Sequence, residues 1–238
     1  MSEFLIGFAI YFGYIILAVS AVSIIKKYGG IPREISRKIM HITFVLSIII
    51  LLKAFRTWYL ASLLMVLFIV IIFPILTFAE KHIKSYSVVL NERRKGEVKR
   101  TMVIMAVCYG SLIAIFWGVL NMPYIVMTSV LTWGCSDATS ALIGPKYGTL
   151  RVRGKTEGVK FVEGVVANAF VSFTVAALTL LIVNPFSWVA SVISAVALAA
   201  ISSVVEVYTP KGLDNLTVPF ALSLAIYLLA LLFGAVGL

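Results

Sequence analysis

What this chain of 238 residues lacks most is charge. Only 13% of it is Asp, Glu, Lys or Arg, whereas a soluble domain averages about 25%. Six stretches contain none of these residues, namely 4–25, 39–52, 57–79, 101–136, 165–205 and 216–238. A helix needs about 20 apolar residues to cross a bilayer, and a soluble core does not require so many uncharged runs of that length. The chain is therefore predicted to be an integral membrane protein.

The uncharged stretches predict an all-α, polytopic bundle of about eight transmembrane helices. Stretches 101–136 and 165–205 are each long enough for two helices, and Asn-Met-Pro at 121–123 and Asn-Pro at 184–185 mark turns near their middles. The expected helices are about 4–25, 36–53, 58–79, 102–120, 123–143, 159–183, 187–207 and 216–236. Because no long linker divides them, we predict a single transmembrane domain over residues 1–238.

Cysteine is also scarce. Cys108 and Cys135 both fall inside predicted spans, so neither a disulfide nor a zinc site is indicated. The first apolar run, of about 22 residues, is longer than the core of a signal peptide and ends in Lys26 and Lys27 rather than in small residues. We expect a membrane span there rather than a cleaved leader.

The few charges lie mostly on one face. If the spans alternate, 18 of the 20 Lys and Arg residues lie in or beside the loops 26–38, 80–101, 144–158 and 208–215, and only Lys53 and Arg56 lie opposite. The positive-inside rule makes the crowded face cytoplasmic, with both termini outside. We expect the protein in the cell membrane with its basic loops in the cytoplasm.

The net charge of +10 has two interpretations. Basic loops fix topology and attract anionic lipid headgroups in most membrane proteins. Alternatively, part of this charge binds a polyanionic substrate. Nucleic acid is not expected as a partner, because the basic residues lie in short loops beside the membrane rather than on a docking module.

The acidic residues are more informative. Nine of the ten, all but Glu3, lie on the cytoplasmic half. Asp137, Glu163 and Glu206 lie inside or at the edge of predicted spans, where an ionisable group is costly and by default indicates a function. Glu206 is close enough to a loop to reach headgroup water, whereas Asp137 lies deeper. Asp137 is therefore the strongest candidate for a functional acid.

Asp137 opens the most distinctive motif of the chain. Gly144 and Gly148 follow it in the order Asp-x6-Gly-x3-Gly. Next come Arg151, Arg153 and two Lys…Glu-Gly elements, Lys155-Thr-Glu157-Gly158 and Lys160-Phe-Val-Glu163-Gly164. Glycines let a backbone approach a phosphate, basic side chains neutralise it, and carboxylates can hold Mg²⁺. The order suits nucleotide-dependent chemistry on a lipid headgroup, although Gly-x3-Gly is also compatible with close helix packing.

This motif resembles the signature of the polyprenol kinase family, which comprises dolichol kinases, phytol kinases and CTP-dependent diacylglycerol kinases. CDP-diacylglycerol synthases are more distantly similar. The resemblance covers about residues 35–220 and includes three further elements, which are Arg37-Lys38-x-x-His41, Arg94-Lys95-Gly96-Glu97, and Glu206 followed by Asp214-Asn215-x-x-x-Pro219.

Two positions depart from the family pattern. Ser140 stands where the family usually has Ala, and the loop before Glu163 is longer than usual. Either Glu157 or Glu163 can therefore be the motif glutamate. We prefer Glu163 because the sequence that follows it continues as the family's helix does.

The resemblance implies a CTP-dependent lipid kinase that phosphorylates the hydroxyl of a membrane isoprenoid alcohol of the dolichol or polyprenol type. It implies Mg²⁺ held by Asp137, Glu163 and Asp214, and His41 or a carboxylate as the proton acceptor. The implied contacts to the nucleotide phosphates are Arg37, Lys38, Gly144, Lys146, Gly148, Arg151, Arg153, Lys155, Lys160 and Gly164. Further site candidates are Arg94, Glu97, Glu157, Glu206 and Asn215.

Two other functions compete with the lipid kinase. A cytidylyltransferase of the same superfamily would join a phosphorylated lipid to the α-phosphate of CTP, although the Arg-Lys-x-x-His and Asp-Asn elements favour the kinase branch. A transporter would also carry carboxylates inside the membrane. Against a transporter, the charges gather at one face and the two halves show no internal repeat.

Overall fold

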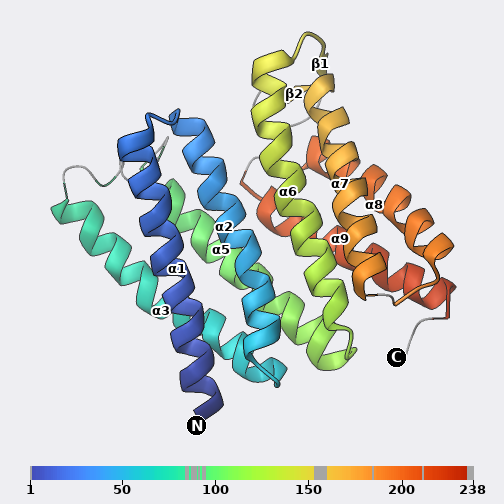
Figure 1. Cartoon of the computed structure of the whole chain (residues 1–238), viewed down its shortest axis with the longest axis horizontal. Coiled ribbons are helices and arrows are strands. Elements are labelled where there is room, and N and C mark those ends of the chain that lie inside the picture. The colour runs from blue at the N-terminus through green and yellow to red at the C-terminus, as the bar shows by residue number, and fades with distance from the viewer. Residues whose placement is uncertain are drawn as a thin grey trace. The chain divides into compact units, whose positions relative to one another are not determined.

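The computed structural model describes residues 2–83, 86, 90, 92, 95–152, 160–183, 185–210 and 212–234. In these residues it contains eight long helical segments (Figure 1). They are α1 (Ser2–Gly29), α2 (Arg33–Ala54), α3 (Trp58–His82), α5 (Glu97–Leu112) continuing into the π-helix η1 (Ile113–Val119), α6 (Pro123–Tyr147), α7 (Val162–Val183), α8 (Trp188–Tyr208) and α9 (Asp214–Leu232). Their bounds follow the predicted spans closely, so the all-α, polytopic membrane fold is confirmed.

Seven of these segments are long and apolar enough to cross a membrane, and α6 is the exception. It has sufficient length, but it carries many hydroxyl residues, and Thr128, Ser129, Thr132 and Ser136 are all fully buried. Polar side chains that face neighbouring helices do not contact lipid, so they are compatible with a spanning helix. The seven apolar helices fit an integral membrane protein, and the crossing by α6 stays a prediction.

The chain divides into two compact units, residues 1–114 and 115–238. A single catalytic domain over the whole chain therefore stays a prediction. Unit 1 contains α1, α2, α3 and α5, with α1 packed on α2 and α3 packed on α5. Its core is aromatic, since Phe68 makes edge-to-face contacts with Tyr11 and with Phe44.

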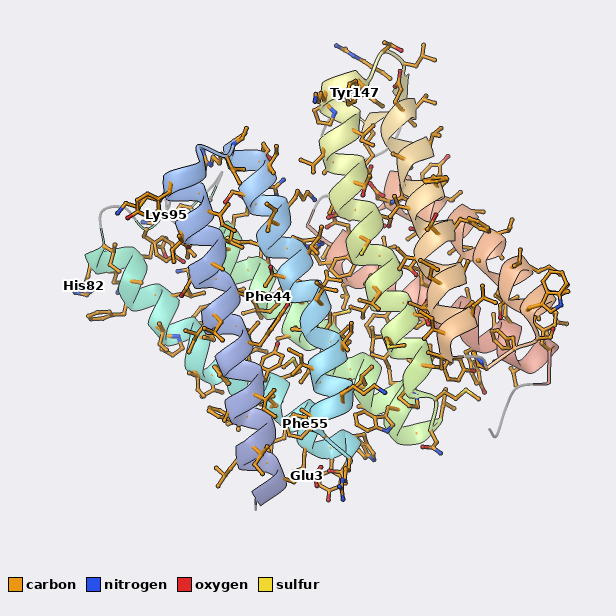
Figure 2. The ribbon with its side chains drawn as sticks, in the orientation of Figure 1. Glu3, Phe44, Phe55, His82, Lys95 and Tyr147 are labelled. Carbon is orange, nitrogen blue, oxygen red and sulfur yellow. The ribbon has the colours of Figure 1, made fainter. Side chains whose placement is uncertain are left out.

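The two ends of unit 1 differ in chemistry (Figure 2). At one end, Glu3 accepts a hydrogen bond from the backbone N–H of Arg56 at 2.7 Å. The ring of the buried Phe55 packs against Gly7, where a Cβ atom would lie only 2.4 Å from the ring. Figure 2 labels Glu3 and Phe55 at this end and His82 at the opposite end, where the ion pairs of the unit gather.

Unit 2 is a closed ring of four helices, because α6 and α8 each pack against both α7 and α9. A pair of two-residue strands lies between α6 and α7, at the ends where these helices meet (Figure 1). Strand β1 (Arg151–Val152) pairs antiparallel with β2 (Lys160–Phe161). This small hairpin adds to the predicted all-helical pattern. It brings Lys160 to the start of α7 and next to the end of α6.

Candidate functional site

The site begins where α6 and α7 cross at very short distance. A Cβ atom added to Gly164 would lie 3.2 Å from the Cα of Gly144 and 3.2 Å from the carbonyl oxygen of Ser140. A side chain at Gly164 would require the neighbouring backbone to shift by a few tenths of an ångström, whereas a Cβ atom at Gly144 would lie at an ordinary contact distance, 3.6 Å from the Cα of Gly164. The contacts of Gly144 and Gly164 are therefore those of a helix crossing, which was the alternative interpretation of this motif.

Gly148 has a packing role of the same kind. A Cβ atom there would lie 2.2 Å from the ring of Phe161 and 2.3 Å from the carbonyl oxygen of Gly144. The N–H of Gly148 donates to that same carbonyl at 2.9 Å and closes the last turn of α6. The absence of a side chain thus lets β2 pack across the end of α6.

Glu163 binds the turn that follows α6. Its Oε1 accepts hydrogen bonds from the N–H of Thr149 at 2.7 Å and from the Thr149 hydroxyl. Its other oxygen, Oε2, is buried and has no hydrogen-bond partner within the described residues. A carboxylate in the first turn of α7 is also favoured by the helix dipole. Glu163 thereby ties the end of α6 to the beginning of α7.

The centre of the polar site is Glu206, near the end of α8. Its side chain is only 12% exposed. Oε1 accepts hydrogen bonds from the hydroxyl of Ser140 on α6 at 3.1 Å and from Nζ of Lys160 at 3.3 Å. Nζ of Lys160 also donates to the backbone carbonyl of Glu206. A buried carboxylate requires such partners, because burying a charge without them is expensive.

Asn168 supplies the remaining partner of Glu206. Its amide nitrogen donates to Oε2 of Glu206, and its oxygen accepts from Ser203 at 3.1 Å and from Ser172 at 3.4 Å. The two hydroxyl donors fix the amide oxygen on their side, which leaves the amide nitrogen facing the carboxylate. Asn168 is 1% exposed, so this orientation is held by packing as well.

Asp137 lies close enough to Glu206 for their charges to interact. One turn before Ser140 on α6, Ser136 contacts Ser202 of α8 at 3.5 Å, so α6 and α8 approach each other across the ring. We call the five residues Asp137, Ser140, Lys160, Asn168 and Glu206 the Glu206 cluster. It joins side chains of α6, β2, α7 and α8 at one end of unit 2, where Lys160 bonds Glu206 and Asp137 lies within range of the charge of Glu206.

A second group of charges lies at one end of unit 1. Arg37 pairs with Glu34 at 3.1 Å and with Glu97 of α5 at 3.8 Å, so two predicted site residues from distant segments meet here. On the same helix as Arg37, Lys38 is buried and His41 is half-buried. The structure thus gathers the Arg-Lys-x-x-His element and Glu97 at one end of this unit.

The same end of unit 1 contains further buried charges. Lys99 pairs with Glu80, and both side chains are less than one-fifth exposed. Glu92, 4% exposed, accepts a hydrogen bond from the N–H of Val98 in the first turn of α5. Burial and the nearby carboxylates of Glu92 and Glu80 raise the pKa of Tyr86 to about 12. Tyr86 therefore stays a neutral phenol at physiological pH.

The remaining predicted residues lie apart from the Glu206 cluster or outside the described residues. Lys146 is exposed and lies 4.9 Å from the ring centre of Tyr147, and Arg151 is exposed on β1. Asp214 begins α9, where it accepts a hydrogen bond from the N–H of the buried Asn215. Four predicted site residues are outside the described residues, namely Arg94, Arg153, Lys155 and Glu157.

The three predicted metal ligands Asp137, Glu163 and Asp214 are all described, but they are not assembled into one site. Within the described part of the chain, no group of three or more His, Cys, Asp or Glu side chains is placed to hold a metal ion. The pair that the structure does bring together is Asp137 and Glu206. Carboxylate oxygens suit Mg²⁺, which usually takes one or two of them together with phosphate oxygens and waters. The donor chemistry of this pair therefore fits Mg²⁺.

Sequence reasoning missed Asn168 as a site residue and ranked Glu206 below Asp137. Asn168 stands in the uncharged stretch 165–205. An amide in such a stretch indicates a hydrogen bond to a neighbouring helix, and this could have identified Asn168 from the sequence. Ser140 was noted only as a departure from a pattern, yet its hydroxyl bonds Glu206.

Comparison of the chain with protein-family models, with curated proteins and with solved structures finds no match.

Proposed function

We propose that this protein is a lipid kinase, which transfers the γ-phosphoryl group of CTP to the hydroxyl of a membrane isoprenoid alcohol of the dolichol or polyprenol type. The observation that carries the proposal is the Glu206 cluster, with its paired carboxylates and its lysine at one end of a membrane helix unit. Phosphoryl transfer is catalysed mainly by positioning and by charge neutralisation. CTP and the isoprenoid alcohol are inferred from the resemblance of the Asp137 motif.

Asp137 and Glu206 are the residues that we expect to hold Mg²⁺. Neighbouring carboxylates repel each other, and a divalent cation bound by both removes that repulsion. When bound, Mg²⁺ would neutralise charge on the phosphate oxygens. In this proposal Glu163 keeps the structural role that its bonds to Thr149 support, and it is no longer assigned to the metal.

Lys160 is the residue that we expect to contact a phosphate. Its ammonium donates to the carboxylate of Glu206, and a polyphosphate that approaches the cluster competes for this donor. Asp137 and Glu206 would hold Mg²⁺, which would supply positive charge to Glu206 in place of Lys160 and leave the ammonium available to a phosphate. Lys146 and Arg151, exposed near the same end of unit 2, are further candidates for phosphate contacts.

In the proposed reaction the oxygen of the lipid hydroxyl attacks the γ-phosphorus of CTP in line with the leaving oxygen. The bond from that phosphorus to the bridging oxygen breaks, and CDP leaves. The hydroxyl proton passes to a base, and for this role the family resemblance implies His41 or a carboxylate. Asn168 acts as a positioning residue, because it holds the carboxylate of Glu206 in one orientation.

The proposed sidedness follows from charge. Arg37 and Lys99 lie at the ion-paired end of unit 1, and in unit 2 Lys146 lies in the last turn of α6 and Arg151 on β1. By the positive-inside rule these ends face the cytoplasm, where nucleotide is available, and both termini lie outside. We propose the cell membrane as the location.

The test uses purified protein, Mg²⁺ and CTP labelled at either the α- or the γ-phosphate, with a panel of isoprenoid alcohols and a diacylglycerol as acceptors. We expect label from γ-labelled CTP in the lipid, and ATP run in parallel tests the choice of nucleotide. Asp137→Asn should lower kcat/KM by at least about 100-fold, which corresponds to about 2.7 kcal/mol of transition-state stabilisation. Glu3→Gln is the control, because it makes the same carboxylate-to-amide change at the end of unit 1 that carries no predicted site residue. It should leave activity unchanged.

Other outcomes separate the competing functions. Label in the lipid from α-labelled CTP would overturn the kinase and identify a cytidylyltransferase. Solute uptake into proteoliposomes without nucleotide, together with no labelled lipid, would identify a transporter. Phosphorylation that survives Asp137→Asn undiminished would overturn the assignment of Asp137 to the metal.

A further inference from the structure

The interior of unit 2 contains hydroxyl side chains that the Glu206 cluster does not use. Thr128 and Thr132 lie on α6, Ser191 and Ser194 lie on α8, and all four have an exposed fraction of 0%. None of their hydroxyl oxygens has a hydrogen-bond partner among the residues that the structure describes. These four buried hydroxyls require an explanation.

The relative register of α6 and α8 follows from two contacts. Ser140 bonds Glu206, and one helical turn earlier Ser136 contacts Ser202. Both pairs are separated by 66 residues, so the two helices run parallel with a constant offset.

The same offset relates the four hydroxyls to one another. Carried toward the beginning of both helices, it places Thr128 level with Ser194 and Thr132 level with Leu198. Ser191 lies a turn below Ser194 on α8. Leu198, which is also fully buried, is level with Thr132 and lies one turn after Ser194 on α8. The four hydroxyls therefore lie on neighbouring turns of α6 and α8, deeper in the unit than the Ser136–Ser202 contact.

Close packing of small residues does not by itself explain unpartnered hydroxyls. A Ser or Thr inside a helix commonly donates to the carbonyl three or four residues earlier, as Thr139 and Thr179 do here. A buried hydroxyl without a partner costs free energy. A lipid tail cannot supply the missing bonds. Water can, because it donates and accepts and typically makes about three bonds to buried polar groups.

We propose that Thr128, Thr132, Ser191 and Ser194 bind water inside unit 2, in a site beside Leu198 and deeper in the unit than the Ser136–Ser202 contact. This site goes beyond the proposed kinase activity and does not depend on it. It makes the interior of unit 2 hydrated at a depth where its outer surface contacts lipid tails.

The test is hydroxyl-radical labelling by X-ray radiolysis of the purified full chain, read by mass spectrometry. Radicals form from the waters that are present, so they label side chains next to bound water even where bulk solvent does not reach. Leu198→Met places a reactive reporter beside the proposed water. Leu112→Met places the same reporter at an equally buried position in unit 1. Leu-to-Met changes conserve volume and are well tolerated.

We expect the reporter at position 198 to be labelled several-fold faster than the reporter at position 112. Adding Thr128→Val and Ser194→Ala to Leu198→Met should reduce its labelling to the level of the control. Equal labelling of the two reporters would overturn the proposal. Labelling at 198 that persists without the two hydroxyls would also overturn it, because the label would then come from general solvent access.

Thermal unfolding gives an independent reading for Thr128→Val with Ser194→Ala. If these hydroxyls were dry and unpartnered, their removal would relieve a cost and raise Tm. If they bind water, removal loses hydrogen bonds and Tm stays level or falls. A rise in Tm without any fast labelling at position 198 would establish a dry core and refute the site.

Discussion

Asn168→Leu tests most directly whether the Glu206 cluster is built as described. Leucine has the same number and branching of side-chain heavy atoms as asparagine, so the substitution leaves no cavity, and its larger methyl groups add to the loss through overpacking. It removes the donor to the carboxylate of Glu206 and the acceptor for Ser203 at 3.1 Å. A hydrogen bond to a charged group contributes about 1.5–3 kcal/mol and a neutral one about 0.5–1.5 kcal/mol. The expected loss of stability is therefore about 2–4.5 kcal/mol, summed from these two bonds.

The assay is thermal unfolding in detergent micelles. At about 2–4 °C per kcal/mol for a chain of this size, the loss lowers Tm by about 4–18 °C. Ser172→Ala is the matched control, since it removes only the 3.4 Å contact to Asn168, and it should cost no more than about 1 kcal/mol. A Tm for Asn168→Leu no lower than that of Ser172→Ala would refute the reasoning.

Asn168→Asp keeps the shape of the side chain but removes the amide N–H that donates to Glu206. The introduced carboxyl can donate to Glu206 only when it is protonated, and when ionised it adds a further negative charge beside Glu206 and Asp137. The variant should therefore be more stable in acidic than in neutral buffer, relative to the wild-type protein at each pH. An identical Tm difference at both pH values would contradict the placement of Asn168 in the cluster.

Three further predictions follow from the packing and the ion pairs. Gly148→Ala should destabilise the protein by about 1–3 kcal/mol through overpacking at the end of α6. Gly13→Ala has nothing within 4 Å of the new Cβ atom, so it should stabilise α1 by about 0.5–1 kcal/mol. Chemical denaturation of both variants measures the two free energies of unfolding. Glu163→Gln should weaken the hydrogen bonds to the turn after α6. Amide hydrogen exchange should then be faster in that turn, with little change elsewhere. Unaltered exchange would contradict the bonds of Glu163 to that turn. Lys99→Met and Glu80→Gln should each destabilise unit 1, and the double variant should lose less than the sum of the two; strictly additive losses would show that the pair does not interact.

The sequence by itself determined the membrane fold. Uncharged runs of sufficient length have to be helical in a bilayer, because every backbone polar group must find its partner within the segment. Proline has no backbone N–H to pair, so Pro123 and Asn184-Pro185 predicted the turns between helices. In the structure α6 begins at Pro123 and α8 begins at Trp188. The charge count also predicted that charged residues gather at helix ends, and the ion pairs of unit 1 do so.

Which of those charges act together was decided only by the tertiary structure. Asp137, Glu163 and Glu206 look alike in sequence, since each is an acid within or at the edge of a span. The rotation of each helix, which is set by packing such as the Gly144–Gly164 crossing, turns Glu163 toward Thr149 and turns Glu206 toward Ser140 and Lys160.

Asn168 is a second residue whose role could not be predicted from the sequence. Its amide lies in a run that length and hydropathy assign to the membrane, and those quantities do not record the direction of a side chain. Only when α7 and α8 pack does the amide meet Glu206 on one side and Ser203 on the other. Hydrophobicity thus determined that the helices cross the membrane, whereas the geometry of their contacts determined which polar groups they bury together.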